Sequence, residues 1–301
     1  MSHTKSESHS LISVLPFLVF PPLFWAGNAA VGRAVRDDIN PFALSFGRWV
    51  IALVVLLPFV LHIMRRDWSL YKQHWGKIIG SALVGVGAFN TLVYTGLHST
   101  TTTNTILLNS CIPALIMIFG AIFYKQKLHL IQVIGLLISL TGVMIVVLRG
   151  DWESFLSLAF NPGDIIVFSA MICWALYTLW MKEIPATIDR KGLTGIQIAI
   201  AVIALAPFFV WETMQPETPF SLNTNAMLGL AYVGIFPSVI AYLLYTIGVQ
   251  KVGPVRAGLS IHLMPVFGVL LSVFVLGETM HLYHIVGIVC IALGLILSNR
   301  N

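Results

Sequence analysis

The chain has 301 residues, of which 57% are hydrophobic and only 10% are charged, with a formal net charge of +5. A soluble globular domain averages roughly 25% charged residues, so this composition excludes a protein with an ordinary water-facing surface. The basic residues form no patch within a globular region. They occupy short gaps between apolar runs, a pattern that argues against nucleic-acid binding and is typical of membrane proteins.

Ten apolar runs follow one another along the chain, each suited to a membrane-spanning helix of about 20 residues. The first run has a weak charged region before it and contains three prolines, so we interpret it as a retained helix rather than a cleaved signal peptide. The spans are predicted near residues 11–31, 42–63, 78–97, 104–124, 128–148, 165–181, 193–211, 227–249, 255–276 and 280–297. This pattern predicts an all-α integral membrane protein with a tail at residues 1–10 and no separate soluble domain.

The distribution of Lys and Arg predicts how the spans are oriented. With the N-terminus in the cytoplasm, thirteen of the 17 basic residues fall in inner segments and three in outer segments. The positive-inside rule therefore places both termini in the cytoplasm. The remaining basic residue, Arg48, lies within the second span. Either its side chain extends to the outer interface, or it attracts a substrate carboxylate or orders an outer gate.

The chain is also predicted to be an internal duplication, with five spans at residues 11–150 and five at 151–301. The stretch "ILLNSCIPALIMIF" (106–119) aligns with "GLSIHLMPVFGVLL" (258–271) at an offset of 152 residues, which matches Pro113 with Pro265. The offset continues downstream, where Gly142 matches Gly294. Because each repeat has an odd number of spans, the second enters the membrane from the opposite side, as in inverted-repeat transporters.

The two matched prolines lie about halfway along their spans, so we expect them to act as hinges. A helix broken at that depth is tolerable only where protein or a watery cavity satisfies the freed backbone. Ser110 and His262 each stand three residues before the proline, so both are expected to face a central cavity. The alternative for His262 is a hydrogen bond to the carbonyl of a neighbouring helix, without contact with a substrate.

Polar and aromatic residues at helical spacing provide candidates for the lining of that cavity. Trp25 and Trp174 occupy matching positions in the two repeats. The candidate substrate-binding residues are Trp25, Asn28, Arg48, Tyr94, Asn109, Ser110, Trp174, Tyr177, Tyr242, Tyr245 and His262. For any single Trp or Tyr, core packing or an interfacial belt is the alternative. No metal or cofactor is expected, since the three cysteines are isolated within apolar runs.

The middle of every predicted span lacks Asp and Glu. Aromatic walls with amide groups and an Arg or His suit a neutral or zwitterionic solute with an apolar side chain. Proton coupling would have to use a histidine, and facilitated diffusion fits equally well. Catalysis is not expected, because Ser260 and His262 point to different faces of a helix and no nucleophile or metalloprotease motif is present.

The ten spans, the proline-centred fourth and ninth spans, "LGE" (276–278) and the last helix "GIVCIALGLIL" resemble the EamA-type branch of the drug/metabolite transporter superfamily. Within that branch the chain resembles YddG-type aromatic amino-acid exporters of the bacterial inner membrane. The resemblance covers essentially the whole chain. It implies a basket of helices around a central substrate cavity and alternating access by rocking of helix bundles. The first repeat departs from the pattern, with "YKQ" (124–126) in place of "LGE".

Together these observations predict a transporter that exports amino acids, particularly aromatic or bulky apolar ones. Its expected partners are the amino acid and membrane lipid, and a monomer suffices because one chain holds both repeats. The alternative is a carrier of another small metabolite or drug, such as a phosphorylated sugar. Such a substrate would call for several Lys or Arg residues in the cavity, whereas Arg48 is the single one within a predicted span.

Overall fold

The structure, a computed structural model, describes residues 11–151, 161–215, 220–276 and 279–298, together with Glu153 and Leu156. The predicted tail at 1–10 lies outside the described residues, as do the last two residues of "LGE". The regular elements of the described part are all helices, and its single β-bridge joins Ile39 to Phe220. The prediction of an all-α protein is confirmed for these residues.

The helices follow the order of the predicted spans. The first repeat comprises α1 (Leu11–Ala34), α2 (Pro41–Arg66), α3 (Trp68–Gln73), α4 (Trp75–Ser81), the π-helix η1 (Ala82–Ala88), α5 (Phe89–Leu97), α6 (Thr102–Asn109), α7 (Ile112–Tyr124) and α8 (Leu130–Val147). The second comprises α10 (Pro162–Glu183), α11 (Arg190–Thr213), α12 (Thr224–Ile235), the π-helix η2 (Phe236–Ala241), α13 (Tyr242–Val252), α14 (Pro254–Leu259), the 3₁₀ turn η3 (Ser260–His262), α15 (Leu263–Leu276) and α16 (Leu282–Ser298).

Eight helical segments are long and apolar enough to cross a membrane. They are Pro41–Arg66, Trp75–Leu97, Thr103–Tyr124, Leu130–Val147, Pro162–Glu183, Arg190–Thr213, Thr224–Val252 and Pro254–Leu271. These segments correspond to the second to ninth predicted spans. The first and tenth fall on α1 and α16, whose apolar helical segments Ser13–Asn28 and Leu282–Ser298 are shorter. Membrane crossing by these two helices stays a prediction.

Asparagine and proline set where several helices begin. Asn40, Asn161 and Asn223 each cap a helix by accepting a hydrogen bond from a backbone N–H of its first turn. Pro41 and Pro162 follow directly as the first helical residue, where a missing N–H removes no helical hydrogen bond. These caps fix the starts of α2, α10 and α12 on the side of the bundle that the charge pattern assigns to the outside.

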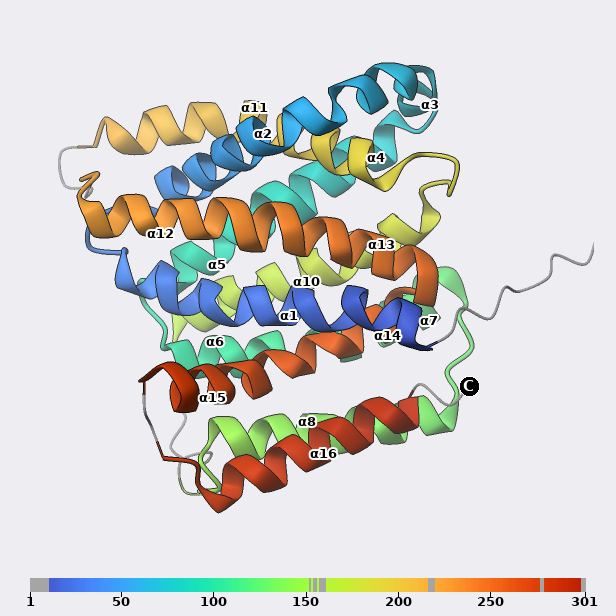
Figure 1. The fold of residues 1–301 in the computed structure, drawn as a ribbon, viewed down its shortest axis with the longest axis vertical. Coiled ribbons are helices and arrows are strands. Elements are labelled where there is room, and N and C mark those ends of the chain that lie inside the picture. The colour runs from blue at the N-terminus through green and yellow to red at the C-terminus, as the bar shows by residue number, and fades with distance from the viewer. Residues whose placement is uncertain are drawn as a thin grey trace, which may run out of the picture.

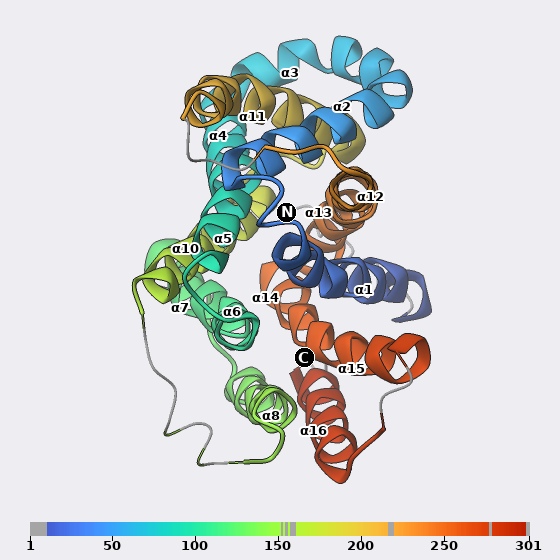
Figure 2. The same cartoon turned by 90° about the vertical axis from the view of Figure 1, so that its left-hand side faces the viewer.

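The helices lie side by side, and two pairs of equivalent helices form the ends of the bundle (Figure 1). The pair α2 and α11 forms one end of the longest axis, and the pair α8 and α16 forms the other. Gly142 and Gly287 let α8 and α16 approach closely, since a Cβ on Gly142 would lie 2.7 Å from the Gly287 carbonyl oxygen. Figure 2 shows α5, α6 and α10 on one side of the molecule and α1, α12 and α15 on the other.

The third and eighth spans each contain a π-helix near the middle, η1 and η2, which the hydropathy pattern did not predict. A π-helix changes the helical hydrogen-bonding pattern and is frequent at functional sites. Partners from the opposite repeat bind carbonyls in both segments. The Tyr242 hydroxyl donates to the Gly85 carbonyl at 2.9 Å, and Trp25 Nε1 donates to the Pro237 carbonyl at 3.1 Å. The two repeats are therefore joined through their π-helices.

The fourth and ninth spans are interrupted just before their prolines. Helix α6 ends at Asn109 and α7 begins at Ile112, while the 3₁₀ turn η3 separates α14 from α15. The two interruptions contact each other, because His262 Nε2 lies 2.9 Å from the Ser110 carbonyl oxygen. A carbonyl left over at one break is thus satisfied by a side chain from the matching break.

Candidate functional site

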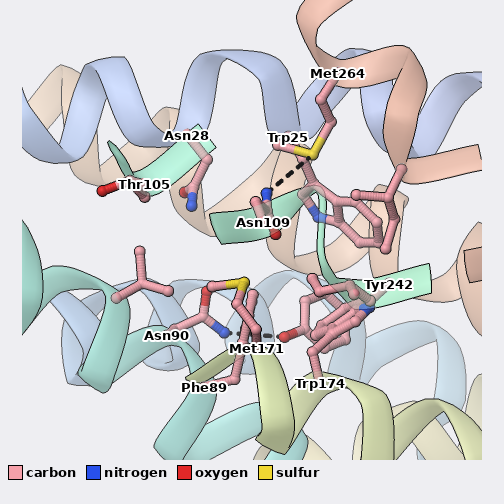
Figure 3. Close-up of a pocket in the computed structure, with 13 residues that line it drawn as sticks. Trp25, Asn28, Phe89, Asn90, Thr105, Asn109, Met171, Trp174, Tyr242 and Met264 are labelled. Atoms are coloured by element: carbon pink, nitrogen blue, oxygen red, sulfur yellow. Dashed lines mark hydrogen bonds between the residues drawn. The ribbon is translucent and has the colours of Figure 1, made fainter. Parts of the chain in front are cut away.

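A pocket lies between the two repeats at the level of the π-helices and the helix breaks (Figure 3). It is lined by Trp25, Asn28, Phe89, Asn90, Val93, Thr105, Asn109, Ile112, Met171, Trp174, Tyr242, Ile261 and Met264. Its free volume is about 50 Å³, room for one or two water molecules at about 30 Å³ each. Apolar walls with a few convergent amide and hydroxyl groups are the usual composition of a small-molecule site.

Aromatic rings form one wall of this pocket. The equivalent residues Trp25 and Trp174 meet edge to face, with their ring centroids 5.0 Å apart and their planes at 87°. The ring of Tyr242 stands at 90° to Trp174 at 5.3 Å, and Phe89 lies 4.6 Å from Trp174. Edge-to-face pairs contribute about 0.5–1.5 kcal/mol each. These contacts order the rings of the wall, and separating any one pair costs only this modest free energy.

Arg48 is completely buried and supports the polar side of the pocket. Its Nη1 donates to Asn90 Oδ1 at 2.7 Å, to the Tyr94 hydroxyl at 2.6 Å and to Asn28 Oδ1 at 3.2 Å. Its Nε donates to Ser238 Oγ at 2.7 Å. The interpretation that Arg48 extends to the outer interface is therefore wrong, because the side chain points into the bundle and is 0% exposed.

The guanidinium of Arg48 has no carboxylate partner within the part of the chain that the structure describes. Its Nη2 is buried and has no hydrogen-bond partner there. A buried unpaired N–H group carries a desolvation penalty of about 1–3 kcal/mol, more for a charged group. Arg48 therefore holds the two pocket amides, Asn28 and Asn90, in place and keeps one buried N–H donor group, Nη2, without a partner among the described residues.

His262 lies outside the pocket lining and is 1% exposed. Its Nε2 faces the Ser110 carbonyl at 2.9 Å, and its Nδ1 faces Ser139 Oγ at 2.6 Å. Because a carbonyl only accepts hydrogen bonds, Nε2 carries the proton and Nδ1 accepts from the serine hydroxyl. These contacts match the alternative in which His262 bonds a neighbouring helix carbonyl. Ser110 also lies outside the lining, so both residues depart from the expected cavity position.

The structure brings most of the other candidates together. Those that line the pocket are Trp25, Asn28, Asn109, Trp174 and Tyr242. Tyr94 lies behind the lining, where it binds Arg48. Tyr177 and Tyr245 pack beneath Trp174, with ring centroids 5.3 and 5.2 Å from it.

Sequence reasoning missed Phe89, Met171 and Met264 as pocket residues, because single apolar residues in apolar spans give no signal. Asn90 also lines the pocket; it lies four residues before Tyr94, on the polar stripe that the sequence places on one face of the third span. Figure 3 shows Asn109 Nδ2 directed at Met264 Sδ, 3.4 Å away, across the two helix breaks.

A neighbouring cavity extends from the pocket toward one face of the bundle. A second cavity of about 320 Å³ shares Thr105, Asn109 and Met264 with it and reaches Arg149 and His284, on the side that the charge pattern assigns to the outside. Toward the opposite side, the ring of Tyr177 packs on Gly85, where an added Cβ would lie 2.1 Å from Tyr177 Cδ2. The arrangement is therefore closed at Tyr177 and extends toward the predicted outer face.

Comparison with known proteins agrees with this architecture. A solved crystal structure superimposes with a TM-score of 0.74 over 95% of this chain and 97% of that chain at 18% identity, which shows the fold alone. The chain is similar to the uncharacterized transporter YyaM of Bacillus subtilis, with 25% identity over 92% of this chain and 90% of the relative. It is also similar to an uncharacterized transporter of Archaeoglobus fulgidus, with 24% identity over 98% of both chains.

The family comparison covers both halves of the molecule. The EamA-like transporter family matches residues 12–148 and again residues 161–300, so each half of the chain carries one copy of the family's repeat. The same two halves meet at the pocket through Trp25 and Trp174. The chain is a multi-pass membrane transporter, not an enzyme, and belongs to the EamA-like transporter family within the drug/metabolite transporter superfamily.

Proposed function

We propose that this transporter exports amino acids with aromatic or bulky apolar side chains across the bacterial inner membrane. In this proposal ten helices cross the membrane, both termini are cytoplasmic, and the two inverted repeats rock to expose the pocket to each side in turn. One chain supplies both repeats, so a monomer is sufficient. One observation carries the proposal: an aromatic wall that includes Trp25 and Trp174 lies in the same pocket as the amides of Asn28 and Asn90, which bind the buried guanidinium of Arg48. The Nη2 of that guanidinium has no partner among the described residues.

The chemistry of the pocket suits the two ends of such a substrate. The carboxylate would accept a charge-assisted hydrogen bond from Arg48 Nη2, and the side chain would pack against the rings of Trp25 and Trp174. The α-ammonium would find the amide oxygen of Asn109, whose Nδ2 is already directed at Met264. The lining residues include no Asp or Glu. A purely cationic solute would therefore lack a counter-charge.

The pocket must widen to hold this substrate. Its free volume is about 50 Å³, whereas a benzene ring occupies an engineered cavity of about 150 Å³. Separation of the edge-to-face pair Trp25 and Trp174 would open the required space, at a cost of about 0.5–1.5 kcal/mol for the lost ring contact. A substrate ring that replaces one partner would restore that contact. The tryptophan pair thus occupies the place of the substrate ring when the pocket is empty.

A phosphorylated sugar is the second candidate class, and the same residues argue against it. Its phosphate carries about two negative charges at neutral pH, and phosphate sites in proteins combine several Arg, Lys or backbone N–H donors. The pocket lining contains no Lys or Arg, and Arg48 behind it has one unpaired nitrogen. One open donor matches a carboxylate better than a dianion.

The test is uptake of labelled phenylalanine, leucine and glucose 6-phosphate into liposomes that contain the purified protein. We expect saturable phenylalanine and leucine uptake, and no sugar phosphate uptake. Repeating the assay with and without a pH gradient separates proton coupling from facilitated diffusion. Uptake of the sugar phosphate with no movement of any amino acid would refute the proposed substrate class.

A matched pair of variants then tests the pocket. Trp174→Ala removes the central ring of the wall and should reduce phenylalanine uptake at least tenfold, about 1.4 kcal/mol in transition-state terms. Trp211→Ala removes the same side chain from the outside of α11, where Trp211 is 59% exposed, and should leave uptake unchanged. Equal activity of the two variants would remove Trp174 from the proposed site.

A further inference from the structure

The inner half of the bundle, between the pocket and the predicted cytoplasmic face, buries a second guanidinium. Arg190, the first residue of α11, is 5% exposed. Its Nη2 donates to the carbonyl oxygen of Ile184 at 2.7 Å, whereas Nε and Nη1 are buried without a partner among the described residues. Removing charged N–H groups from water without new partners is costly. The single contact with Ile184 leaves most of that cost uncompensated.

Other unpaired polar atoms gather around Arg190. The hydroxyl of Tyr177 on α10 is fully buried without a hydrogen-bond partner in the described chain. Tyr177 lies about two helical turns before Ile184, the C-terminal cap of α10 whose carbonyl binds Arg190. Gln197 follows Arg190 by seven residues and so shares its face of α11; its Oε1 is also unpaired. The ion pairs found on this side of the described structure join Arg66 to Asp67 and Asp189, and Lys77 to Glu183, and none includes Arg190.

Tyr177 stands between this cluster and the pocket. Its ring centroid is 5.3 Å from that of Trp174 and 6.0 Å from that of Tyr242, and both of those residues line the pocket. The same ring packs on Gly85 of η1 and closes the inner path. A movement of Tyr177 away from Gly85 would therefore connect the pocket with Arg190.

We propose that Arg190 and Tyr177 form a carboxylate-binding site on the cytoplasmic side of the pocket, closed in this structure, which receives the substrate before it reaches Arg48. This inference rests on the proposed amino-acid transport and adds a second recognition point for the same substrate. When the inner path opens, the carboxylate accepts hydrogen bonds from the guanidinium and from the Tyr177 hydroxyl. In the closed state Nε and Nη1 of Arg190 and the Tyr177 hydroxyl have no partner among the described residues.

A purely structural role for Arg190 explains less of the arrangement. Its bond to Ile184 satisfies a carbonyl at the C-terminus of α10, where a positive charge also interacts favourably with the helix dipole. A lysine would perform that role equally well. This capping of α10 explains the position of Arg190 Nη2. It does not explain why Nε and Nη1 of Arg190 and the hydroxyl of Tyr177 are buried without partners among the described residues.

The test compares L-phenylalanine with L-phenylalaninamide, which lacks the carboxylate, as inhibitors of labelled leucine uptake into liposomes. In the wild type the amide should inhibit much more weakly than phenylalanine. Arg190→Gln should reduce this preference about tenfold, the effect of losing a hydrogen bond to a charged group. Lys191→Gln removes the same charge from the next residue, which is exposed, and should keep the wild-type preference.

Two further variants keep the proposal testable if Arg190→Gln fails to fold. Tyr177→Phe retains the ring that packs on Gly85 and should weaken the carboxylate preference without lowering the melting temperature. Arg190→Lys retains the cap and should also lose part of the preference. An unchanged preference in every active Arg190 and Tyr177 variant would overturn this site. A wild-type protein that takes up no amino acid would instead overturn the proposed function.

Discussion

Single residues in this transporter show how a polar group can be stable inside a membrane bundle. Arg48 distributes its hydrogen bonds over Asn28 on α1, Asn90 and Tyr94 on α5, and Ser238 on η2. Hydrogen bonds that connect several helices rigidify the place where they meet, and in a low-dielectric interior each bond is stronger than in water. The polar side of the pocket therefore depends on one guanidinium, and its unpaired Nη2 is the group to which we assign the substrate carboxylate in the proposed function.

His262 makes the contact that the sequence analysis gave as the alternative to a cavity position, a hydrogen bond to a carbonyl of a neighbouring helix. It connects the carbonyl at one helix break with Ser139 on α8. We expect His262→Leu to leave both partners unpaired, a loss of about 1–3 kcal/mol for each buried group. The melting temperature of the purified protein should fall, whereas the apparent KM for phenylalanine of the folded fraction should stay the same. His62→Leu, at an exposed position of α2, is the matched control. An altered KM at unchanged stability would show instead that His262 contacts the substrate.

Among the elements, the two π-helices, η1 and η2, connect the two repeats beside the pocket. They occupy matching spans of the two repeats, and each provides a backbone carbonyl to a ring of the opposite repeat. Both also lie beside the pocket: Phe89 follows η1, and Tyr242 follows η2. A rocking motion of one repeat against the other must therefore change the hydrogen bonds of η1 and η2.

The contact of η1 with Tyr177 leads to a prediction about the inner closure. Gly85→Ala should prevent Tyr177 from packing, because the new methyl group would lie 2.1 Å from Cδ2 and 2.2 Å from Cγ of that ring. Hydrogen–deuterium exchange of α10 around Tyr177 should rise. Gly87→Ala is the matched control, since its nearest neighbour is the Ala82 carbonyl oxygen at 3.7 Å. There the change should be neutral or stabilising by up to about 1 kcal/mol. Equal exchange in the two variants would contradict a seal at Gly85.

At the scale of the whole molecule, much of the architecture could be predicted and most of the site geometry could not. Apolar runs of about 20 residues and the offset of 152 residues between Pro113 and Pro265 extend over many positions. A prediction based on them therefore does not depend on the correct interpretation of any single residue. The π-helices have the same hydropathy as ordinary helices, so no pattern marked them. Trp25 and Trp174 were predictable from their matching positions. The partners of Arg48 and His262 were not, because they depend on how helices rotate and approach in three dimensions.

The inner face of the bundle carries the charges that support the predicted orientation. Lys77 pairs with Glu183 at 2.7 Å, and Arg66 pairs with Asp67 at 2.7 Å. The hydrogen bond with Arg66 holds the pKa of Asp67 below its ordinary value. The Lys77–Glu183 pair and the contact of Arg66 with Asp189 at 3.7 Å connect the two repeats on the side opposite Arg149 and His284. If the inner path opens, the segments joined by these contacts, around Arg66 and Lys77 in the first repeat and around Glu183 and Asp189 in the second, must separate.

The remaining prediction concerns the number of spans. Helix α1 has 24 residues and α16 has 17, which at about 1.5 Å per residue gives lengths of roughly 36 and 26 Å against a hydrocarbon core of about 30 Å. Both can therefore cross, with local thinning of the bilayer or anchoring residues compensating for the shorter one. Ten crossings put the two chain ends on the same side, and the excess of basic residues assigns that side to the cytoplasm.

Single cysteines in a background without Cys111, Cys173 and Cys290 test this topology in intact cells. Ser6→Cys near the start and Asn301→Cys at the end should both resist a membrane-impermeant maleimide. Asp37→Cys, at a position that is 87% exposed between α1 and α2, should react. Labelling of one terminus but not the other would mean an odd number of crossings. In that case the two five-helix repeats would no longer be inverted, and a single pocket between them would have no symmetric way to open to both sides.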